Sequence, residues 1–172
     1  PTSVQVNFEL NQVITLLFDL RMLSSTDYLS GWGEWVMNTA HALTQEQHYT
    51  NMVTIDTLDH CERPTASKSF VTLIDEIADT APATLASHLL THLRDHEEYP
   101  GDEALLASET SFVNYWREIY QKKGKDHAIE EAYFVYQYHL ILEPEKLHET
   151  VVHHMQFMWE NYVEAEWKGS LP

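Results

Sequence analysis

Basic residues are scarce in this sequence. Its 172 residues include 10 Lys and Arg but 27 Asp and Glu, so the net charge is −17 when histidine is neutral. Proteins bind nucleic acids and anionic membranes largely through Lys and Arg, whose charges displace counterions or attract acidic headgroups. The charge balance therefore disfavours a nucleic-acid or membrane contact surface on this chain.

Cysteine and long apolar runs are also lacking. The single cysteine, Cys61, cannot form a disulfide within the chain, which excludes the small secreted domains that disulfides hold together. No apolar run approaches the roughly 18 residues that a membrane-spanning helix needs. We expect a cytoplasmic protein without a membrane partner.

Glycine and proline are few, with 5 and 6 residues. Alternating apolar and polar residues, the pattern of a half-buried strand, are rare, whereas apolar residues often recur every three to four positions, the pattern of a helix. Hydrophobic residues make up 44% of the chain and aromatic residues 12%, which favours an ordered core over disorder. The sequence predicts an all-α fold, a single bundle of about eight helices over residues 1–172.

Capping residues and prolines indicate where these helices begin. Thr44 and Gln47 form a capping box, Pro82 and Pro144 suit first turns, and Asp102 is predicted to cap a helix after a break at residues 99–102. The predicted helices cover residues 13–24, 32–43, 44–58, 67–80, 82 to the break, 102–122, 126–142 and 144 onward.

Several of these helices carry apolar residues along one side, at the spacing of an amphipathic helix. They are Ile14, Leu17, Phe18 and Met22, beside Arg21, in the first helix; Phe70, Leu73, Ile74 and Ile77 in the fourth; Leu85, Leu89 and Leu93 in the fifth; and Leu147, Val151, Met155, Met158 and Tyr162 in the last. We expect the last of these stripes to face the core.

Three histidines form the most pointed local pattern. His88, His92 and His96 are four residues apart, so a helix places their rings along one side, where neighbouring imidazoles can share a metal ion. On a helical wheel the three lie at the border of the leucine face, where half-buried side chains are common. A structural histidine row is the favoured interpretation, and a metal-binding bundle or metalloenzyme built on this row is the alternative.

Aromatic residues are concentrated in the last third of the chain. Most have helical spacing and are expected to pack in the core, but a few polar tips among them are also typical of a small-molecule pocket. The candidate pocket residues are Trp116, Tyr120, Tyr136, His148, Trp159 and Tyr162. Phe157 lies opposite the core stripe on the wheel, and with Trp167 it is a candidate for contact with a second subunit or a following domain.

Motifs of catalysis are missing from the sequence. It has no Gly-x-Ser-x-Gly elbow, no glycine-rich phosphate loop and no His-Glu-x-x-His motif. Cys61 is adjacent to His60, but adjacency in sequence does not bring the ring to the sulfur. We therefore expect no enzymatic activity, no catalytic residues and no cofactor.

Two segments of the chain resemble a known family. Residues 159–167, WENYVEAEW, are similar to the Trp…Glu-Trp helix that precedes the winged-helix domain in a group of bacterial ArsR-type transcriptional regulators. The start of the chain resembles the start of the same proteins, with an apolar helix that ends in Leu-Arg-Met-Leu at residues 20–23 and a Trp-containing helix at residues 32–37.

The resemblance implies that this chain is the N-terminal, non-DNA-binding part of such a regulator. It implies an effector-sensing or dimerisation domain, a homodimer, a small-molecule effector, and DNA binding only through a winged helix beyond Pro172. The cysteine-rich metal-sensing signature of ArsR repressors is absent, since Cys61 stands alone. Metal sensing is therefore not expected from the resemblance.

Overall fold

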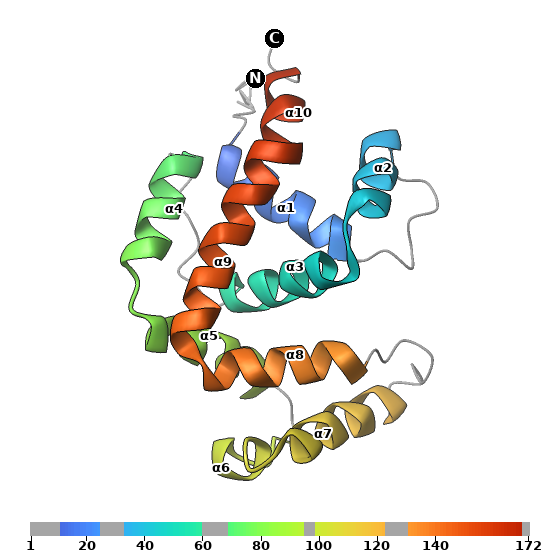
Figure 1. Ribbon diagram of the computed structural model, residues 1–172, viewed down its shortest axis with the longest axis vertical. Helices are drawn as coiled ribbons and strands as arrows, with labels where there is room; N and C mark the ends of the chain where they lie inside the picture. Colours follow the sequence, from blue (N-terminus) through green and yellow to red (C-terminus); the bar gives the residue numbers. More distant parts are fainter. Residues whose placement is uncertain (1–10, 25–32, 60–68, 95–98, 123–130, 170–172) are drawn as a thin grey trace, which may run out of the picture.

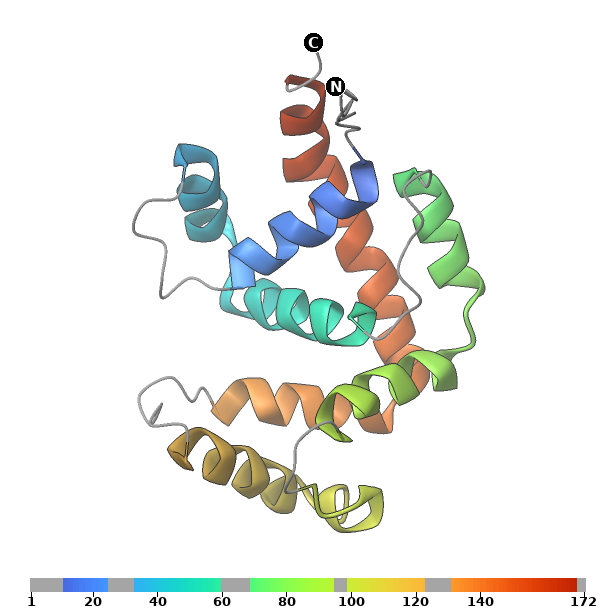
Figure 2. The same ribbon diagram turned by 180° about the vertical axis from the view of Figure 1, so that it is seen from behind.

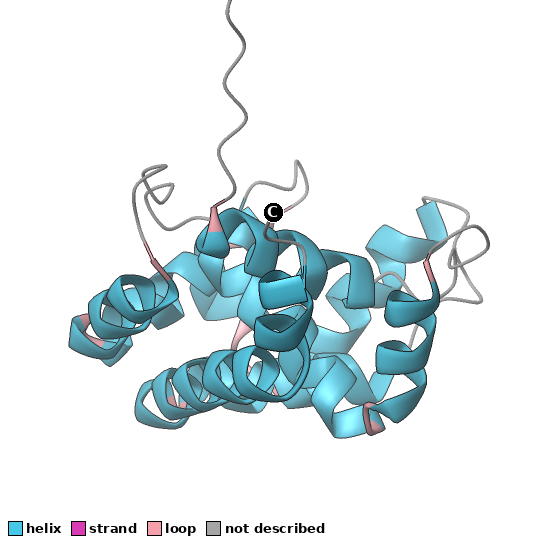
Figure 3. Ribbon diagram, turned by 90° about the horizontal axis from the view of Figure 1, so that it is seen from above, coloured by secondary structure: helices cyan, strands magenta, loops and turns pink. Residues whose placement is uncertain are grey.

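Every element that the structure describes is a helix. The computed structural model describes residues 11–24, 33–59, 69–94, 99–122 and 131–169, apart from the side chain of His92, and no strand occurs in these ranges (Figure 3). The prediction of an all-α fold is confirmed. Within the same ranges, no helix is both long enough and apolar enough to cross a membrane.

The helices are numbered in chain order. They are α1 (Gln12–Ser24), α2 (Glu34–Ala42), α3 (Gln45–Leu58), α4 (Phe70–Asp79), α5 (Pro82–Arg94), α6 (Asp102–Leu105), α7 (Glu109–Lys122), α8 (Glu131–Leu142), α9 (Pro144–Met158), the π-helix η2 (Trp159–Val163) and α10 (Glu164–Gly169). Because α9, η2 and α10 are continuous, we call them together the last helix.

The last helix is the central support of the fold. It runs along the longest dimension of the molecule (Figure 1). α3, α4, α5 and α8 pack against its α9 part, while α1 packs on α3 and reaches η2 (Figures 1 and 2). α7 packs on α8, and α6 on α7, at the end of the molecule away from α10. The buried apolar side chains form one cluster.

Local capping explains where several helices begin. The Gln47 N–H donates to Thr44 Oγ1 at 3.2 Å and the Thr44 N–H donates to Gln47 Oε1 at 2.8 Å, so the predicted capping box is confirmed. Ser69 caps α4 by accepting from the Thr72 N–H at 3.3 Å. The predicted inner faces of α4 and α5 are both buried in the core cluster.

The helix predicted over residues 102–122 is interrupted. α6 ends at Leu105, and α7 begins at Glu109 after Ser108, whose Oγ accepts from the Ser111 N–H at 3.1 Å. Asp102 does not cap α6: Gly101 holds the N-cap position, and Asp102 forms an ion pair with Arg94 instead. The prediction missed Ser108 as a second capping residue.

α1 buries only part of the apolar stripe that the pattern indicates: Leu17 and Met22 are half-buried and pack against the core cluster. Ile14 and Phe18 are 57% and 56% exposed. The buried side of α1 instead carries Val13, Leu16, Asp19, Leu20 and Leu23. This helix is apolar on two sides, so periodicity alone does not decide which one faces the core.

Candidate functional site

The last helix changes geometry at its centre. The Glu164 N–H donates to the carbonyl oxygen of Trp159, five residues earlier, which is the hydrogen bond of a π-helix. The Asn161 side chain donates to the carbonyl oxygen of Phe157 at 2.8 Å, where an α-helix would use a backbone N–H. The π-helix η2 therefore inserts one extra residue into the helix and turns the residues after it.

This insertion decides which side chain faces the core. Beyond Met158 the next fully buried side chain is Val163, five residues on, and Tyr162 is only half-buried. The α-helical wheel places Tyr162 in the core stripe, whereas in the structure it packs against the edge of the core cluster and Val163 takes the fully buried position. The π turn moves the Tyr162 ring toward the space between the last helix and α2.

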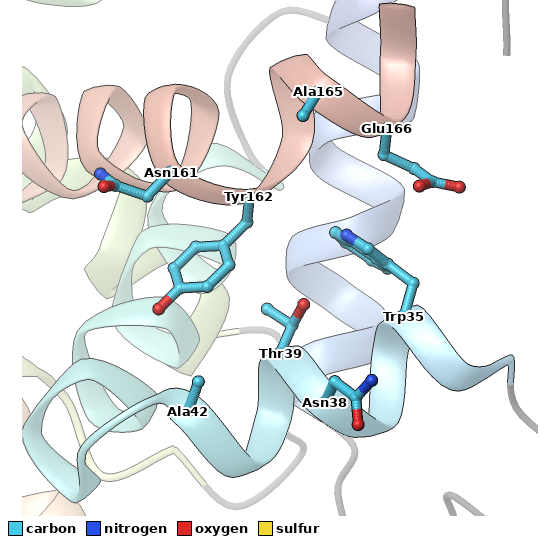
Figure 4. Close-up of a pocket in the computed structure, with 8 residues that line it drawn as sticks. All are labelled: Trp35, Asn38, Thr39, Ala42, Asn161, Tyr162, Ala165 and Glu166. Carbon is cyan, nitrogen blue, oxygen red and sulfur yellow. The ribbon is translucent and has the colours of Figure 1, made fainter. Parts of the chain in front are cut away.

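This space forms a pocket of about 470 Å³, which we call the α2–η2 pocket. Figure 4 shows Tyr162 extending from the last helix and Trp35 from α2 into the gap, with α1 behind them. The volume is in the range of small-molecule sites. The pocket is lined by Trp35, Asn38, Thr39, Ala42, Asn161, Tyr162, Ala165 and Glu166.

The pocket is acidic. Glu166 is on its wall, and none of the described residues that line it is basic. Asp19, on the buried side of α1, is 7% exposed and makes no hydrogen bond in the described part of the chain. Burial, and then the negative charge of Glu166, raise the pKa of Asp19 to about 6. Two carboxyl groups thus influence each other beside the pocket.

A buried polar cluster fixes the last helix just before η2. Asn51 of α3, with no exposed surface, donates from its amide to the Leu20 carbonyl oxygen at 2.6 Å and to Ser24 Oγ at 2.8 Å. Its Oδ1 lies 3.1 Å from His154 Nε2, so the ring nitrogen acts as the donor. Burial lowers the pKa of His154 to about 4, which keeps the ring neutral at neutral pH. These bonds join α1, α3 and α9.

Of the six predicted pocket residues, Tyr162 alone lines the α2–η2 pocket. Trp116 stacks on Phe134 between α7 and α8, with ring centroids 5.2 Å apart, and Tyr120 packs edge-on against both rings. Their role is packing between these two helices.

The other three predicted pocket residues also make separate packing contacts. Tyr136 shares a hydrogen bond of 2.8 Å with Thr50 of α3. His148 Nε2 lies 3.1 Å from the carbonyl oxygens of Ile77 and Ala78, so it binds the C-terminal end of α4. Trp159 stacks on Phe70 of α4 at 4.6 Å. The structure therefore does not gather the predicted aromatic residues into one site.

The histidine row stays a prediction, both as a structural row and as the alternative metal site. His88 is half-buried, whereas the side chain of His92 and all of His96 lie outside the described residues. Among the side chains that the structure describes, no group of three His, Cys, Asp or Glu could hold a metal ion. Cys61 also lies outside the described residues.

The two predicted interface residues are less exposed than expected. Phe157 and Trp167 are half-buried and pack against the core cluster, and the Phe157 ring lies 5.8 Å from that of Tyr162. Their role in an interface stays a prediction. Trp35 and Glu166 were not predicted as site residues, because the residues that face them across the pocket are more than a hundred positions away along the chain.

Comparison with known proteins found no matching family model, no similar curated protein and no similar solved structure. The resemblance to ArsR-type regulators therefore stays a prediction. In the structure, however, two of the segments that carry it face each other across the pocket. Trp35 belongs to residues 32–37, and Tyr162 and Glu166 belong to residues 159–167.

Proposed function

We propose that this chain is the effector-sensing domain of a bacterial ArsR-type transcriptional regulator and that its effector binds in the α2–η2 pocket. The observation that carries the proposal is the composition of the pocket walls. One wall is the Trp-containing helix α2, and the other is the Trp159–Trp167 part of the last helix. Both are segments on which the resemblance depends, so a shared ligand site gives a reason for them to occur together.

The π-helix provides a means of passing the signal along the last helix. If η2 changes to α geometry, each residue after it turns by about 100° around the helix axis. α10 buries none of its residues, so this rotation displaces the half-buried Trp167 from the core cluster but no fully buried side chain of α10. A ligand held between Trp35 and Tyr162 favours one of the two geometries if it binds that geometry more tightly. A winged helix that follows the last helix would be reoriented by the same change.

A screen of small molecules by thermal shift tests the ligand site. Ala165 lines the pocket and is exposed, so Ala165→Trp fills the pocket without disturbing the core. Ala132 is an exposed helical alanine on α8, outside the pocket, and Ala132→Trp is the matched control. We expect ligands that stabilise the wild type and Ala132→Trp but not Ala165→Trp. Equal stabilisation of both variants contradicts the pocket assignment.

The regulatory part of the proposal has its own test. The coding sequence that follows Pro172 should encode a helix-turn-helix pattern with a basic surface. In the protein that includes this region, Ala165→Trp should abolish the effect of the ligand on operator binding and leave binding without ligand intact. A coding sequence that lacks a helix-turn-helix removes the regulator function, whatever the pocket binds.

A further inference from the structure

We propose that the α2–η2 pocket binds an uncharged aromatic molecule that accepts a hydrogen bond from the hydroxyl group of Thr39. This inference rests on the proposed function, because it names the chemical class of the effector. It follows from two features of the same pocket: the position of the Thr39 hydroxyl group and the aromatic rings on opposite walls.

Thr39 is the most deeply buried of the residues that line the pocket, with 4% of its surface exposed. Figure 4 shows its side chain projecting into the gap between Trp35 and Tyr162. Its hydroxyl group makes no hydrogen bond within the described part of the chain. A ligand that fills the pocket displaces water from this hydroxyl group, so the ligand itself has to supply the acceptor.

Other threonines of the helices differ from Thr39 in this respect. A helical threonine commonly donates its hydroxyl proton to the carbonyl oxygen four residues earlier. Those that do so here, at 2.8–2.9 Å, are Thr50, Thr54, Thr57, Thr80 and Thr91. Thr15 and Thr84 also lack this bond, but both are more exposed than Thr39. Thr39 therefore combines burial with a hydroxyl proton that the helix does not use.

The aromatic walls come from Trp35 and Tyr162. Both rings are half-buried and project into the pocket from opposite helices (Figure 4). A flat ring between them contacts both, and aromatic pairs contribute more than the burial of their area alone. Ala42 and Ala165 have small side chains that leave room for such a ring, and the volume of about 470 Å³ suits a ligand of two fused rings.

The polar groups of the wall indicate a ligand without charge. None of the described residues that line the pocket is Lys, Arg or His. A carboxylate or phosphate that leaves water needs a cationic partner, so the wall disfavours an anion. Glu166 is exposed and has an interaction of its own, so it requires no charge on the ligand. A carbonyl oxygen, which is uncharged and accepts hydrogen bonds, matches Thr39.

Three naphthalene probes of one shape test this chemical class. 2-Acetylnaphthalene carries a carbonyl acceptor, 2-isopropenylnaphthalene has a methylene group in its place, and 2-naphthoate is anionic. Affinities are measured by ligand-observed NMR titration. We expect the ketone to bind at least as tightly as the hydrocarbon, although water solvates the ketone better, and we expect the anion not to bind.

Two threonine variants identify the hydrogen bond. Thr39→Val keeps the shape of the side chain and should weaken binding of the ketone about fivefold while leaving the hydrocarbon unchanged. Thr54→Val is the matched control, because Thr54 is equally buried but lies outside the pocket. Both affinities should there stay within about twofold of wild type. An unchanged ketone affinity in Thr39→Val, or an equal loss in both variants, overturns the inference.

The remaining outcomes distinguish the inference from the proposed function. If the anion binds more tightly than the ketone, or if neither neutral probe binds while the screen yields other ligands that Ala165→Trp blocks, the ligand class is wrong and the sensing function stands. If no molecule binds in a way that Ala165→Trp prevents, both are wrong. Binding of the ketone that requires the Thr39 hydroxyl group and an unfilled pocket supports both.

Discussion

Along α9, the inward-facing side chains of Leu147, Val151, Met155 and Met158 have no exposed surface, whereas α10, one helical turn farther on, buries no residue at all. The helix runs without a break from α9 to α10 (Figure 1). It thus has a fully buried face in α9 and no buried residue in α10, with η2 between them. The first part is surrounded by α3, α4, α5 and α8. The second part has α2 opposite it across an open pocket.

Stability and mobility are thus concentrated in different parts of the last helix. α9 supplies stability, because full burial of large apolar side chains contributes most to folding. η2 lines the pocket but is itself held by Val163 and Trp159, which are buried, whereas α10 buries no residue and has more freedom to move.

The largest effect is expected from a cavity in α9. Met155→Ala should lower the free energy of unfolding by about 3 kcal/mol, since it removes a fully buried side chain from a helix that is packed on several sides. Trp167→Ala on α10 removes a larger side chain, but a half-buried one, and should cost about 1 kcal/mol. Urea denaturation measures both. A greater loss of stability from Trp167→Ala than from Met155→Ala would contradict the claim that α9 contributes more to stability than α10.

The second effect depends on pH and comes from His154. Its pKa is about 4 in the folded protein and 6.5 in the unfolded chain, so only the unfolded state gains the proton between these values. The stability contributed by the neutral ring is present above pH 6.5 and is lost as the pH falls toward 4. The loss should reach about 2–3 kcal/mol. His154→Gln keeps a donor to Asn51 and should remove this pH dependence.

The neighbouring histidine is the control for this measurement. His153 is exposed, so His153→Gln changes the same residue type at the neighbouring position without entering the core and serves as the matched control for substitution. Asp19 has the opposite sign: its raised pKa favours the folded state as the pH falls from 6 toward 3.8. The difference between wild type and His154→Gln, measured at each pH, isolates the histidine contribution. A difference that does not change with pH would contradict the claim that His154 is buried and neutral in the folded protein.

The third effect is a gain of stability beside the pocket. Asp19→Asn removes a buried charge, so it should stabilise the protein by about 1 kcal/mol above pH 6, after allowance for solvent screening. The gain should shrink as the pH falls from 6 to 3.8, because Asp19 takes up its proton first in the folded state, and it should vanish well below pH 3.8. Asp75→Asn, on the exposed side of α4, is the control and should have no effect. Thermal melts at pH 7 and pH 3.8 measure both variants.

Much of the fold could be predicted from local sequence patterns. Thr44 with Gln47 indicates the start of α3, and the apolar faces of α4 and α5 are the ones that the structure buries, because each of these signals lies within one helix. In α1, local sequence patterns are not sufficient to identify the buried side. Its sequence has apolar residues on both sides, and only the packing of α3 against it determines that Ile14 and Phe18 are exposed.

The site could be predicted only in part. Tyr162 was among the predicted pocket residues, but Trp35, Thr39 and Glu166 were not, because the pocket forms where α2 meets a segment more than a hundred residues later. The π turn was also missed, since a helical wheel assumes 3.6 residues per turn throughout. Val163, an apolar residue that lies off the predicted stripe, was the available sign of it.

The smallest effect on stability is expected from removing the π turn itself. Deletion of Glu160, an exposed residue of η2, makes Val163 the fourth residue after Met158. Four residues is the α-helical spacing, so Val163 stays in the buried stripe and the last helix becomes α throughout. The free energy of unfolding should change by less than about 1 kcal/mol. Deletion of His153, equally exposed but within α9, turns Met155 and Met158 out of the core and should abolish stable folding.

The Glu160 deletion also tests the role of the π turn in signalling. The shortened helix holds Val163 inward with α geometry already in place, so a ligand has no second geometry to select. Hydrogen exchange should show slower exchange of the amides at residues 159–164 in the deletion variant than in wild type. A ligand that slows the same amides in wild type should have no such effect in the variant. If the ligand protects them equally in both proteins, η2 does not act as a switch, and the pocket must influence the rest of the molecule through α2.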